Sequence, residues 1–168
     1  MLTSHELMGF VSPALANEIL EFARESDKPT YKTVVASVAQ ARHLRPVFLE
    51  RQERTHRHAT MLATLSRPSL DLMAGTLLRA WLVQKQKPML VDFLNALAIE
   101  HKDGVVEDLP ATMEDVKLRA AVDVLLAKYP HEPVAVYLNA FNDMNEAHWD
   151  NLKTMLESDA RLQLGGTA

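Results

Sequence analysis

Apolar residues recur at intervals of three and four along most of this chain, which is the spacing that gives a helix one apolar face. Tyr31, Val34, Val35 and Val38 form one such stripe, and another runs from Leu118 to Tyr129. No stretch alternates between apolar and polar residues between turn signals, as a half-buried strand would. The pattern therefore predicts an all-α protein. The expected helices lie near residues 3–10, 13–26, 30–44, 46–65, 69–86, 88–101, 112–129, 133–144 and 146–157.

Prolines and capping residues indicate where these helices begin. Most of the 8 prolines are separated by the length of one helix and one turn. Proline suits the first helical position because its missing N–H would be unbonded there, and Pro46 is one example. Thr3 with Glu6, and Thr112 with Asp115, have the spacing of a capping box, in which two residues satisfy free N–H groups at a helix start.

A chain of 168 residues is long enough for one domain with a substantial core. We expect residues 1–164 to form a single bundle of about seven to nine helices, followed by a frayed tail at 165–168. The sequences KPMLVDFLNALA (87–98) and EPVAVYLNAFND (132–143) are similar and lie about 44 residues apart. This period is in the range of HEAT repeats, so the C-terminal half is a candidate for a duplicated, HEAT-like helix pair.

Composition narrows the classes of protein to which the chain can belong. Apolar residues make up 48% and charged residues 24%, as in a folded soluble protein. The chain has no cysteine, which excludes disulfides, zinc–thiolate sites, iron–sulfur clusters and cysteine nucleophiles. Its N-terminus lacks the pattern of a signal peptide, and no apolar run is long enough to cross a bilayer. We therefore expect a cytoplasmic protein that is not inserted in a membrane.

Charge is distributed unevenly along the chain, whose net charge is −4. Residues 1–88 carry 12 Lys and Arg against 8 Asp and Glu, a net charge of +4. Residues 89–168 carry 6 against 14, a net charge of −8. Such asymmetry is typical of a nucleic-acid-binding face, or of two surfaces that attract one another within or between chains.

The most basic part of the sequence is the segment 42–67. Three interpretations are compared for it: a metal site, a nucleic-acid interface and the solvated face of a helix. Its arginines suit phosphate groups, but Phe48 is its one aromatic residue for stacking on bases. His56 and His58 are two positions apart, so a helix would place them on opposite faces rather than around one metal ion. The six arginines are Arg42, Arg45, Arg51, Arg54, Arg57 and Arg67.

The solvated helix is the interpretation that the spacing favours. Glu50 precedes Arg54 by four residues and Glu53 precedes Arg57 by four, which is the favourable order for ion pairs on a helix surface. The apolar pair Val47–Phe48 would anchor one end of this helix. We therefore expect one helix over residues 46–65, with histidines that have no buried partner.

Two further groups of residues have the chemistry of a site. Glu100, His101 and Asp103 follow the most apolar helix and begin the longest loop, where an imidazole and two carboxylates could bind a metal ion or transfer protons. The alternative is a histidine favoured by the helix dipole, followed by an Asp-Gly turn. His148 lies beside several carboxylates near the C-terminus and is more typical of a surface residue.

No nucleophile elbow, phosphate-binding loop, dinucleotide fingerprint or zinc-protease motif is present. We therefore expect a non-catalytic module that self-associates or docks a protein partner, without a cofactor or a bound metal. The helices at 69–83 and 89–99 are apolar over more than one stripe, which favours burial against a second copy in a homodimer. The alternatives are a nucleic-acid-associated protein using residues 42–67, and an enzyme or small-ligand binder centred on His101 or His148.

Overall fold

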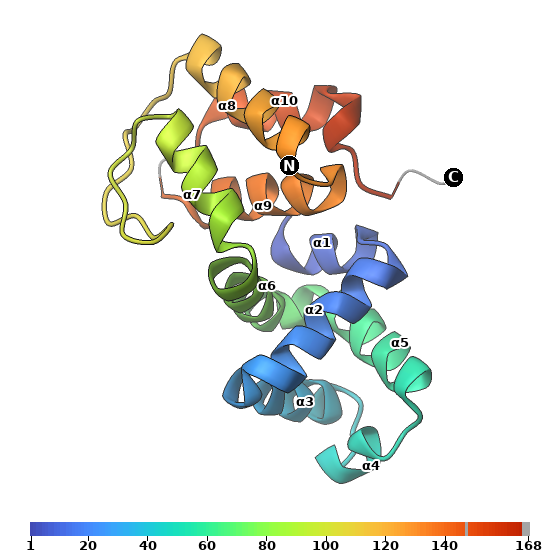
Figure 1. Cartoon of the computed structure of the whole chain (residues 1–168). Helices are drawn as coiled ribbons and strands as arrows, with labels where there is room; N and C mark the ends of the chain where they lie inside the picture. The colour runs from blue at the N-terminus through green and yellow to red at the C-terminus, as the bar shows by residue number, and fades with distance from the viewer. Residues whose placement is uncertain (147, 166–168) are drawn as a thin grey trace. The chain divides into compact units, whose positions relative to one another are not determined.

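The computed structural model of the chain describes residues 1–146 and 148–165. In these ranges the chain forms ten α-helices and two short 3₁₀ helices with no β-strand, which confirms the predicted all-α class (Figure 1). The helices are α1 (Ser4–Phe10), α2 (Pro13–Ser26), α3 (Lys28–Ala41), α4 (Pro46–Glu50), α5 (Arg54–Leu65), η1 (Pro68–Leu70), α6 (Asp71–Lys85), α7 (Lys87–Ala96), α8 (Asp115–Lys128), α9 (His131–Met144), α10 (Asp150–Ser158) and η2 (Ala160–Leu162).

The helix starts follow the sequence signals at some positions and depart from them at others. The Thr3 N–H donates to Glu6 Oε2 at 2.8 Å, which confirms the first capping box. The second is wrong, because α8 begins at Asp115 with Glu114 as its capping residue. The single helix expected over 46–65 is also wrong, since two helices occupy that range. This break explains why ten helices are found where about seven to nine were expected.

The chain falls into two compact units. The N-terminal unit comprises Thr3–Trp81, and the C-terminal unit comprises Met1–Leu2 together with the chain from Leu82 onward. Helix α6 contributes residues to both units. Whether they fold as the single domain expected for residues 1–164 stays a prediction, and most of the expected frayed tail lies outside the described residues.

The N-terminal unit is built around α5, which packs against α1, α2 and α3. Its core is mostly aliphatic, because the apolar stripes of these helices converge there. The fully buried residues of this core include Leu7, Met8, Ile19, Leu20, Val34, Val38, Leu49, Met61 and Leu65.

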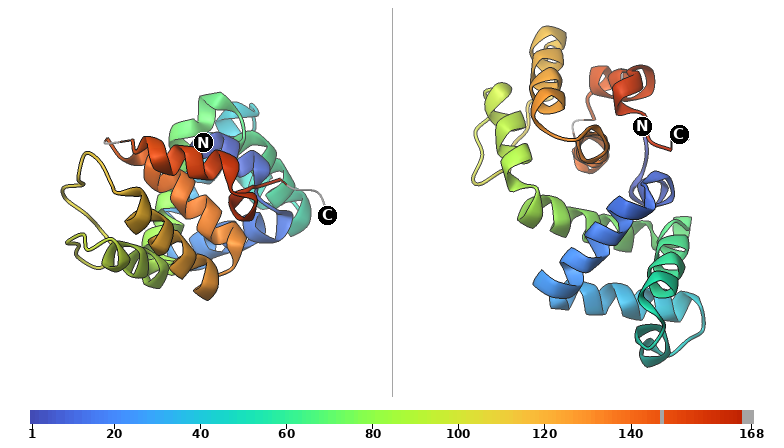
Figure 2. Two further views of the ribbon diagram at one scale, coloured as in Figure 1. Left: turned by 90° about the horizontal axis from the view of Figure 1, so that it is seen from above. Right: turned by 45° about the vertical axis from the view of Figure 1, so that its right-hand side comes forward.

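The C-terminal unit has α9 at its centre. In the right-hand view of Figure 2, α9 is seen along its axis, with α7, α8 and α10 around it. Seven successive residues of α9, from Val134 to Ala140, are buried, as a helix that is covered on several sides requires. The rings of Phe93, Tyr137, Phe141 and Trp149 form a cluster in which four pairs have centroids 5.3–5.9 Å apart. Three of these pairs are edge-on, and the Phe141–Trp149 pair is tilted.

The proposed duplication of a helix pair is not confirmed. The two similar segments fall on α7, which has 10 residues, and on α9, which has 14. Their matching asparagines also differ in environment. Asn139 is buried and accepts a hydrogen bond from the Leu2 N–H, whereas Asn95 is exposed.

The apolar width of α6 and α7 is largely covered by the chain itself. Leu77, Leu78 and Trp81 of α6 are fully buried, as are Phe93 and Leu94 of α7. The apolar width of these two helices is therefore no reason to expect a second copy. No helix among the described residues has the length and apolar character needed to span a membrane.

Candidate protein-docking surface

The segment between α3 and α5 turns sharply because its local sequence ends one helix and begins another. His43 adopts a left-handed conformation with φ of 55°, and the Leu44 N–H then donates to the Ala39 carbonyl at 2.8 Å. This pairing is a Schellman-type end, which closes α3 and redirects the chain. Pro46 then occupies the first position of α4, where it lacks the N–H that would otherwise be free.

A side-chain cap separates α4 from α5. Glu53 accepts a hydrogen bond from the His56 N–H at 3.2 Å and is the N-cap of α5. The backbone N–H groups of Thr55 and His56 lower the pKa of the Glu53 carboxyl. The predicted ion pairs of Glu50 with Arg54 and of Glu53 with Arg57 are not found among the described residues, because no continuous helix carries them.

Three apolar side chains in and just before the short α4 are exposed to solvent. Leu44, Val47 and Phe48 have 39–53% of their surface exposed, and Leu49 is the residue of α4 that enters the core. The expectation that Val47–Phe48 anchors a long helix is therefore wrong. Three exposed apolar residues within five positions form a patch, unlike single apolar residues scattered over a surface.

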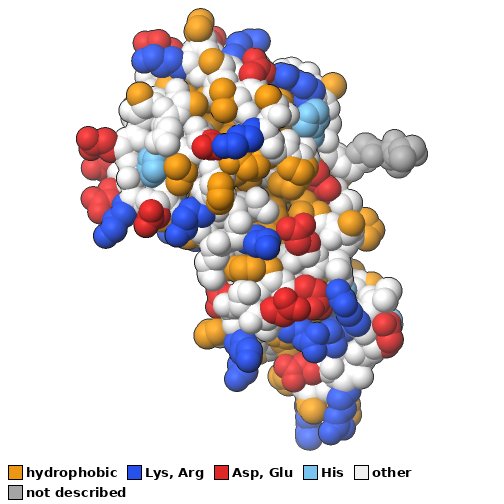
Figure 3. All heavy atoms as spheres, viewed as in Figure 1, with side chains coloured by type: hydrophobic (Ala, Val, Ile, Leu, Met, Phe, Trp, Pro, Cys, Tyr) orange, Lys and Arg blue, Asp and Glu red, His pale blue; other side chains and the backbone are white. Residues whose placement is uncertain are grey.

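Two arginines flank this patch. Arg45 and Arg51 are exposed, and in the part of the chain that the structure describes no carboxylate lies within ion-pair distance of either. Figure 3 shows Lys or Arg side chains beside hydrophobic ones over the α4 region, at the lower end of the view. We name the set of Leu44, Arg45, Val47, Phe48 and Arg51 the α4 corner.

The following helix uses its basic residues in the opposite way. Arg57 is only 6% exposed, and its Nη1 donates to the carbonyls of Glu50 and Gln52 at 3.3 and 3.4 Å. These carbonyls lie at the end of α4 and in the turn before α5, where helical partners are missing. Arg57 therefore fastens the break between the two helices from inside.

His58 is buried in a polar cluster between α2 and α5. Its Nδ1 donates to Asn17 Oδ1 at 2.6 Å, and its Nε2 lies 3.1 Å from Glu21 Oε1 without the geometry of a hydrogen bond. Arg54 Nε lies 3.3 Å from the same Glu21 oxygen. Burial lowers the pKa of His58, the Glu21 carboxylate raises it in part, and nearby arginines including Arg57 lower it further.

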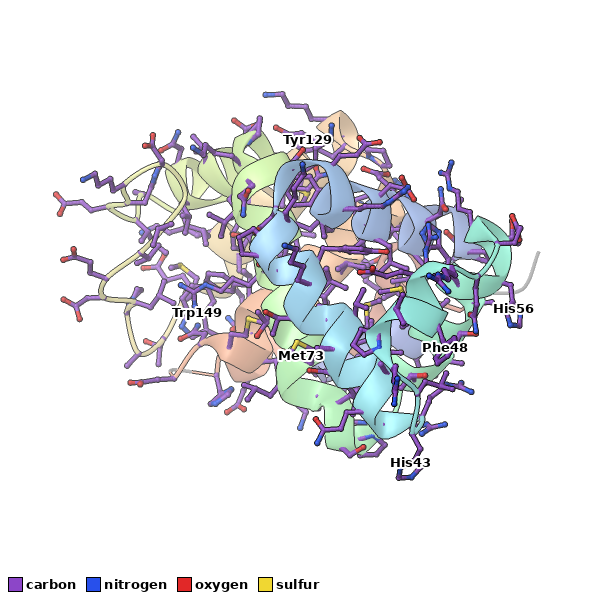
Figure 4. All side chains as sticks on the ribbon, turned by 90° about the horizontal axis from the view of Figure 1, so that it is seen from below. His43, Phe48, His56, Met73, Tyr129 and Trp149 are labelled. Carbon is purple, nitrogen blue, oxygen red and sulfur yellow. The ribbon has the colours of Figure 1, made fainter. Side chains whose placement is uncertain are left out.

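The expectation that neither His56 nor His58 has a buried partner is thus wrong for His58. It fits His56, which is exposed and extends away from the ribbon in Figure 4, as His43 does on another side. His56 and His58 therefore do not point to a common site. Among residues 1–146 and 148–165, no three His, Asp or Glu side chains are grouped as metal ligands.

The six arginines of residues 42–67 therefore have different environments. Arg42 donates from Nε to Thr64 Oγ1 at 2.6 Å, Arg54 pairs with Glu21, and Arg57 is inside the unit. Arg45 and Arg51 belong to the α4 corner. Arg67 is exposed after α5. A continuous phosphate-binding surface would need most of these guanidinium groups to be free on one face, and half of them are engaged within the chain.

The second candidate group lies on the loop between α7 and α8. Asp103 and Gly104 have φ of 52° and 85°, and Lys102 and Val105 exchange two backbone hydrogen bonds of 2.9 and 3.0 Å. Positive φ at both central residues is the geometry of a type I′ turn, for which Asp-Gly is a preferred sequence. Asp103 is thus part of the predicted Asp-Gly turn.

Both ring nitrogens of His101 are used in fixing this loop. The Gly104 N–H donates to Nδ1 at 3.1 Å, so Nε2 carries the proton and donates to Asn95 Oδ1 at 2.8 Å. A cavity of about 620 Å³ lies beside His101. His101, Asn95 and Glu100 line this cavity, but Asp103 does not. Glu100, His101 and Asp103 therefore do not converge on one point. His101 would also have to give up a hydrogen bond to bind a metal ion.

His148 lies in the connection between α9 and α10. It is exposed, has φ of 43°, and donates from Nδ1 to the Asn142 carbonyl at 2.9 Å. The neighbouring Asn142 holds the chain from the other side, because its Oδ1 accepts from the Trp149 N–H at 2.9 Å. These contacts position the start of α10 rather than a reacting group.

Sequence reasoning missed the apolar half of the α4 corner. Pro46 marked the start of α4, but Glu53 is not one of the residue types preferred at an N-cap, so it did not mark the start of α5. No protein-family model, curated protein or solved structure matches the chain.

Proposed function

We propose that the chain is a non-catalytic cytoplasmic module of helices that self-associates as a homodimer, and that the α4 corner is one of its contact surfaces. The observation that supports this most is the exposure of Leu44, Val47 and Phe48 beside Arg45 and Arg51. Aromatic residues and arginine are enriched at protein interfaces, where the ring supplies contact area and the guanidinium supplies directed hydrogen bonds.

The way in which the corner is held also supports a docking role. The left-handed residue at His43, the proline at 46 and the buried Leu49 fix α4 in place, while Arg57 fastens the turn that follows. A surface that is already rigid loses little conformational entropy when it binds. The corner is thus presented by the rigid core of the N-terminal unit.

The other functions weighed from the sequence have less support. A nucleic-acid interface over residues 42–67 would need arginines that are instead bound to Thr64, Glu21 and backbone carbonyls. A site at His101 would need a ring nitrogen that is instead bonded to Asn95 or Gly104.

Light scattering on the purified protein tests this proposal. The mass of one chain is 18.9 kDa, so we expect about twice that mass at micromolar concentration. The double variant Val47→Ser/Phe48→Ser should return to the mass of a single chain while its helical circular dichroism is unchanged. Leu72→Ser is the matched control, because Leu72 is an exposed apolar residue of the same unit outside the corner. A wild-type protein of single-chain mass at every concentration would contradict the proposal.

A further inference from the structure

Helix α8 has apolar side chains on two of its faces. One face packs into the C-terminal unit through Leu118, Ala121, Val122 and Leu125, which are fully buried. On the outer face, Val116 is 79% and Val124 is 46% exposed, with an exposed alanine at position 120 between them. Residues four apart lie above one another on a helix, so these three form one outer apolar stripe.

A polar cavity lies beside this stripe. It has a volume of about 430 Å³ and is formed by α8, α10 and the start of η2. Its acidic lining residues are Asp115, Asp123 and Asp159, and its basic ones are Arg119 and Arg161. One of the two cations is already engaged, because Arg161 contacts Asp159 at 2.6 Å and Asp123 at 3.0 Å.

The hydroxyl and amide donors of the cavity wall are used within the chain. The hydroxyls of Thr154 and Ser158 donate to backbone carbonyls one turn earlier, at 2.9 and 2.7 Å. The Asn151 amide donates to Asp115 Oδ1 and to the Met113 carbonyl, both at 2.7 Å. What these residues still offer is the lone pairs of carboxylate and hydroxyl oxygens. The chemistry that complements them is a donor-rich cation such as a guanidinium group.

We propose that this surface, formed by the outer stripe of α8 and the adjoining acidic cavity, receives the α4 corner of a second copy of the chain. The inference rests on the proposed self-association and names the surface that the corner contacts. In this contact Val116 and Val124 cover Val47 and Phe48, and the carboxylates of Asp115 and Asp123 face Arg45 or Arg51. We call the receiving surface the α8 face.

Charge complementarity selects this occupant over the simplest rival. If two copies met corner to corner, the two-fold axis would bring the same arginines of both chains together. The C-terminal unit has 14 Asp and Glu against 8 Lys and Arg, so a basic corner is attracted to it. A membrane or a nucleic acid would meet an acidic surface at the α8 face and is disfavoured there.

Exchanging the charges of the two surfaces tests the contact. The corner variant is Arg45→Glu/Arg51→Glu, and the face variant is Asp115→Lys/Asp123→Lys. We expect each variant alone to have the mass of one chain by light scattering. An equimolar mixture should regain the wild-type mass, because each reversed surface then meets its reversed counterpart. Arg67→Glu and Glu107→Lys, which reverse exposed charges elsewhere in each unit, should leave the mass unchanged.

The outcomes separate this inference from the proposed function. A corner variant of single-chain mass with a face variant that stays dimeric would overturn the α8 face and leave the corner as an interface. Wild-type protein of single-chain mass would overturn both. Should the face variant fail to fold, Val116→Ser/Val124→Ser replaces it, since both side chains are exposed. We expect that variant also to have single-chain mass, and a dimeric one would overturn the contact.

Discussion

The basic segment of residues 42–67 contains two regions of similar composition and opposite environment. From 43 to 51 the chain presents apolar and arginine side chains to solvent, and only Leu49 reaches the core. From 54 to 65 it buries an arginine and a histidine among the helices of the N-terminal unit. Charge content therefore does not decide whether such a segment is a surface. What decides it is the position of the helix break at residues 51–53.

The largest expected effect on stability is at Arg57, a residue of the buried region whose side chain donates to the carbonyls of the turn between the two regions. Arg57→Ala removes two hydrogen bonds to the turn carbonyls and leaves those carbonyls without a partner. We expect the free energy of unfolding to fall by about 2–3 kcal/mol, measured by urea denaturation. The exposed Arg51→Ala is the control and should change it by less than about 0.5 kcal/mol. Equal losses at the two arginines would remove the distinction between the regions.

The buried histidine gives this region a pH dependence that the α4 corner lacks. Because the pKa of His58 is lowered in the folded protein, the unfolded chain binds more protons near its ordinary pKa of about 6.5. Stability should therefore fall as pH decreases from about 7 through that value. His58→Gln cannot titrate, so its stability should be flatter over this window in thermal unfolding. A wild type whose stability rises over the same window would mean that Glu21 dominates and His58 is protonated.

The helix break itself depends on the Glu53 cap. Glu53→Ala removes the acceptor of the His56 N–H and should destabilise the start of α5, with a smaller loss of unfolding free energy than Arg57→Ala. Glu50→Ala changes an exposed acid of α4 without removing a cap and is the matched control. Thermal unfolding of the two variants at neutral pH compares them. If Glu50→Ala were the more harmful, the cap would not be what starts α5.

The smallest expected effect is at His56, the exposed counterpart of His58. His56→Ala should change the free energy of unfolding by less than about 0.5 kcal/mol, because the side chain extends into solvent. Urea denaturation of this variant beside His58→Ala measures the contrast between two histidines that are two residues apart. A loss at His56 as large as that at His58 would contradict the assignment of the two environments.

The fold class could be predicted because it depends on a repeated local pattern. The stripes of α3, α8 and α9 are long, and every one of them has the helical period, so single errors do not change the class. The buried role of His58 could not be predicted, because it depends on Asn17 and Glu21, which are far away in sequence. The Asp-Gly turn at 103–104 could be predicted because two neighbouring residues determine it.

The α4 corner was missed for a different reason. The periodicity of 46–65 continues through the break, since Val47, Phe48 and Met61 keep a plausible helical spacing even though the chain leaves the helix at residue 51. Side-chain hydrogen bonds from Arg57 to the turn carbonyls, which the apolar periodicity does not report, stabilise the interrupted form. The α8 face was missed because the inner stripe of that helix already explains its amphipathic pattern. Val116 and Val124 on the outer face then carried no separate signal in the sequence.

The melting temperature as a function of protein concentration is the most direct test of the proposal that one region of residues 42–67 binds a second copy while the other stabilises the fold. A dimer that dissociates on unfolding is stabilised by mass action, so the wild-type melting temperature should rise with concentration. Val47→Ser/Phe48→Ser should lose that rise and keep the low-concentration value, whereas Arg57→Ala should melt lower than wild type at every concentration and keep the rise. A wild-type melting temperature that is independent of concentration and equal to that of Val47→Ser/Phe48→Ser would contradict the proposal.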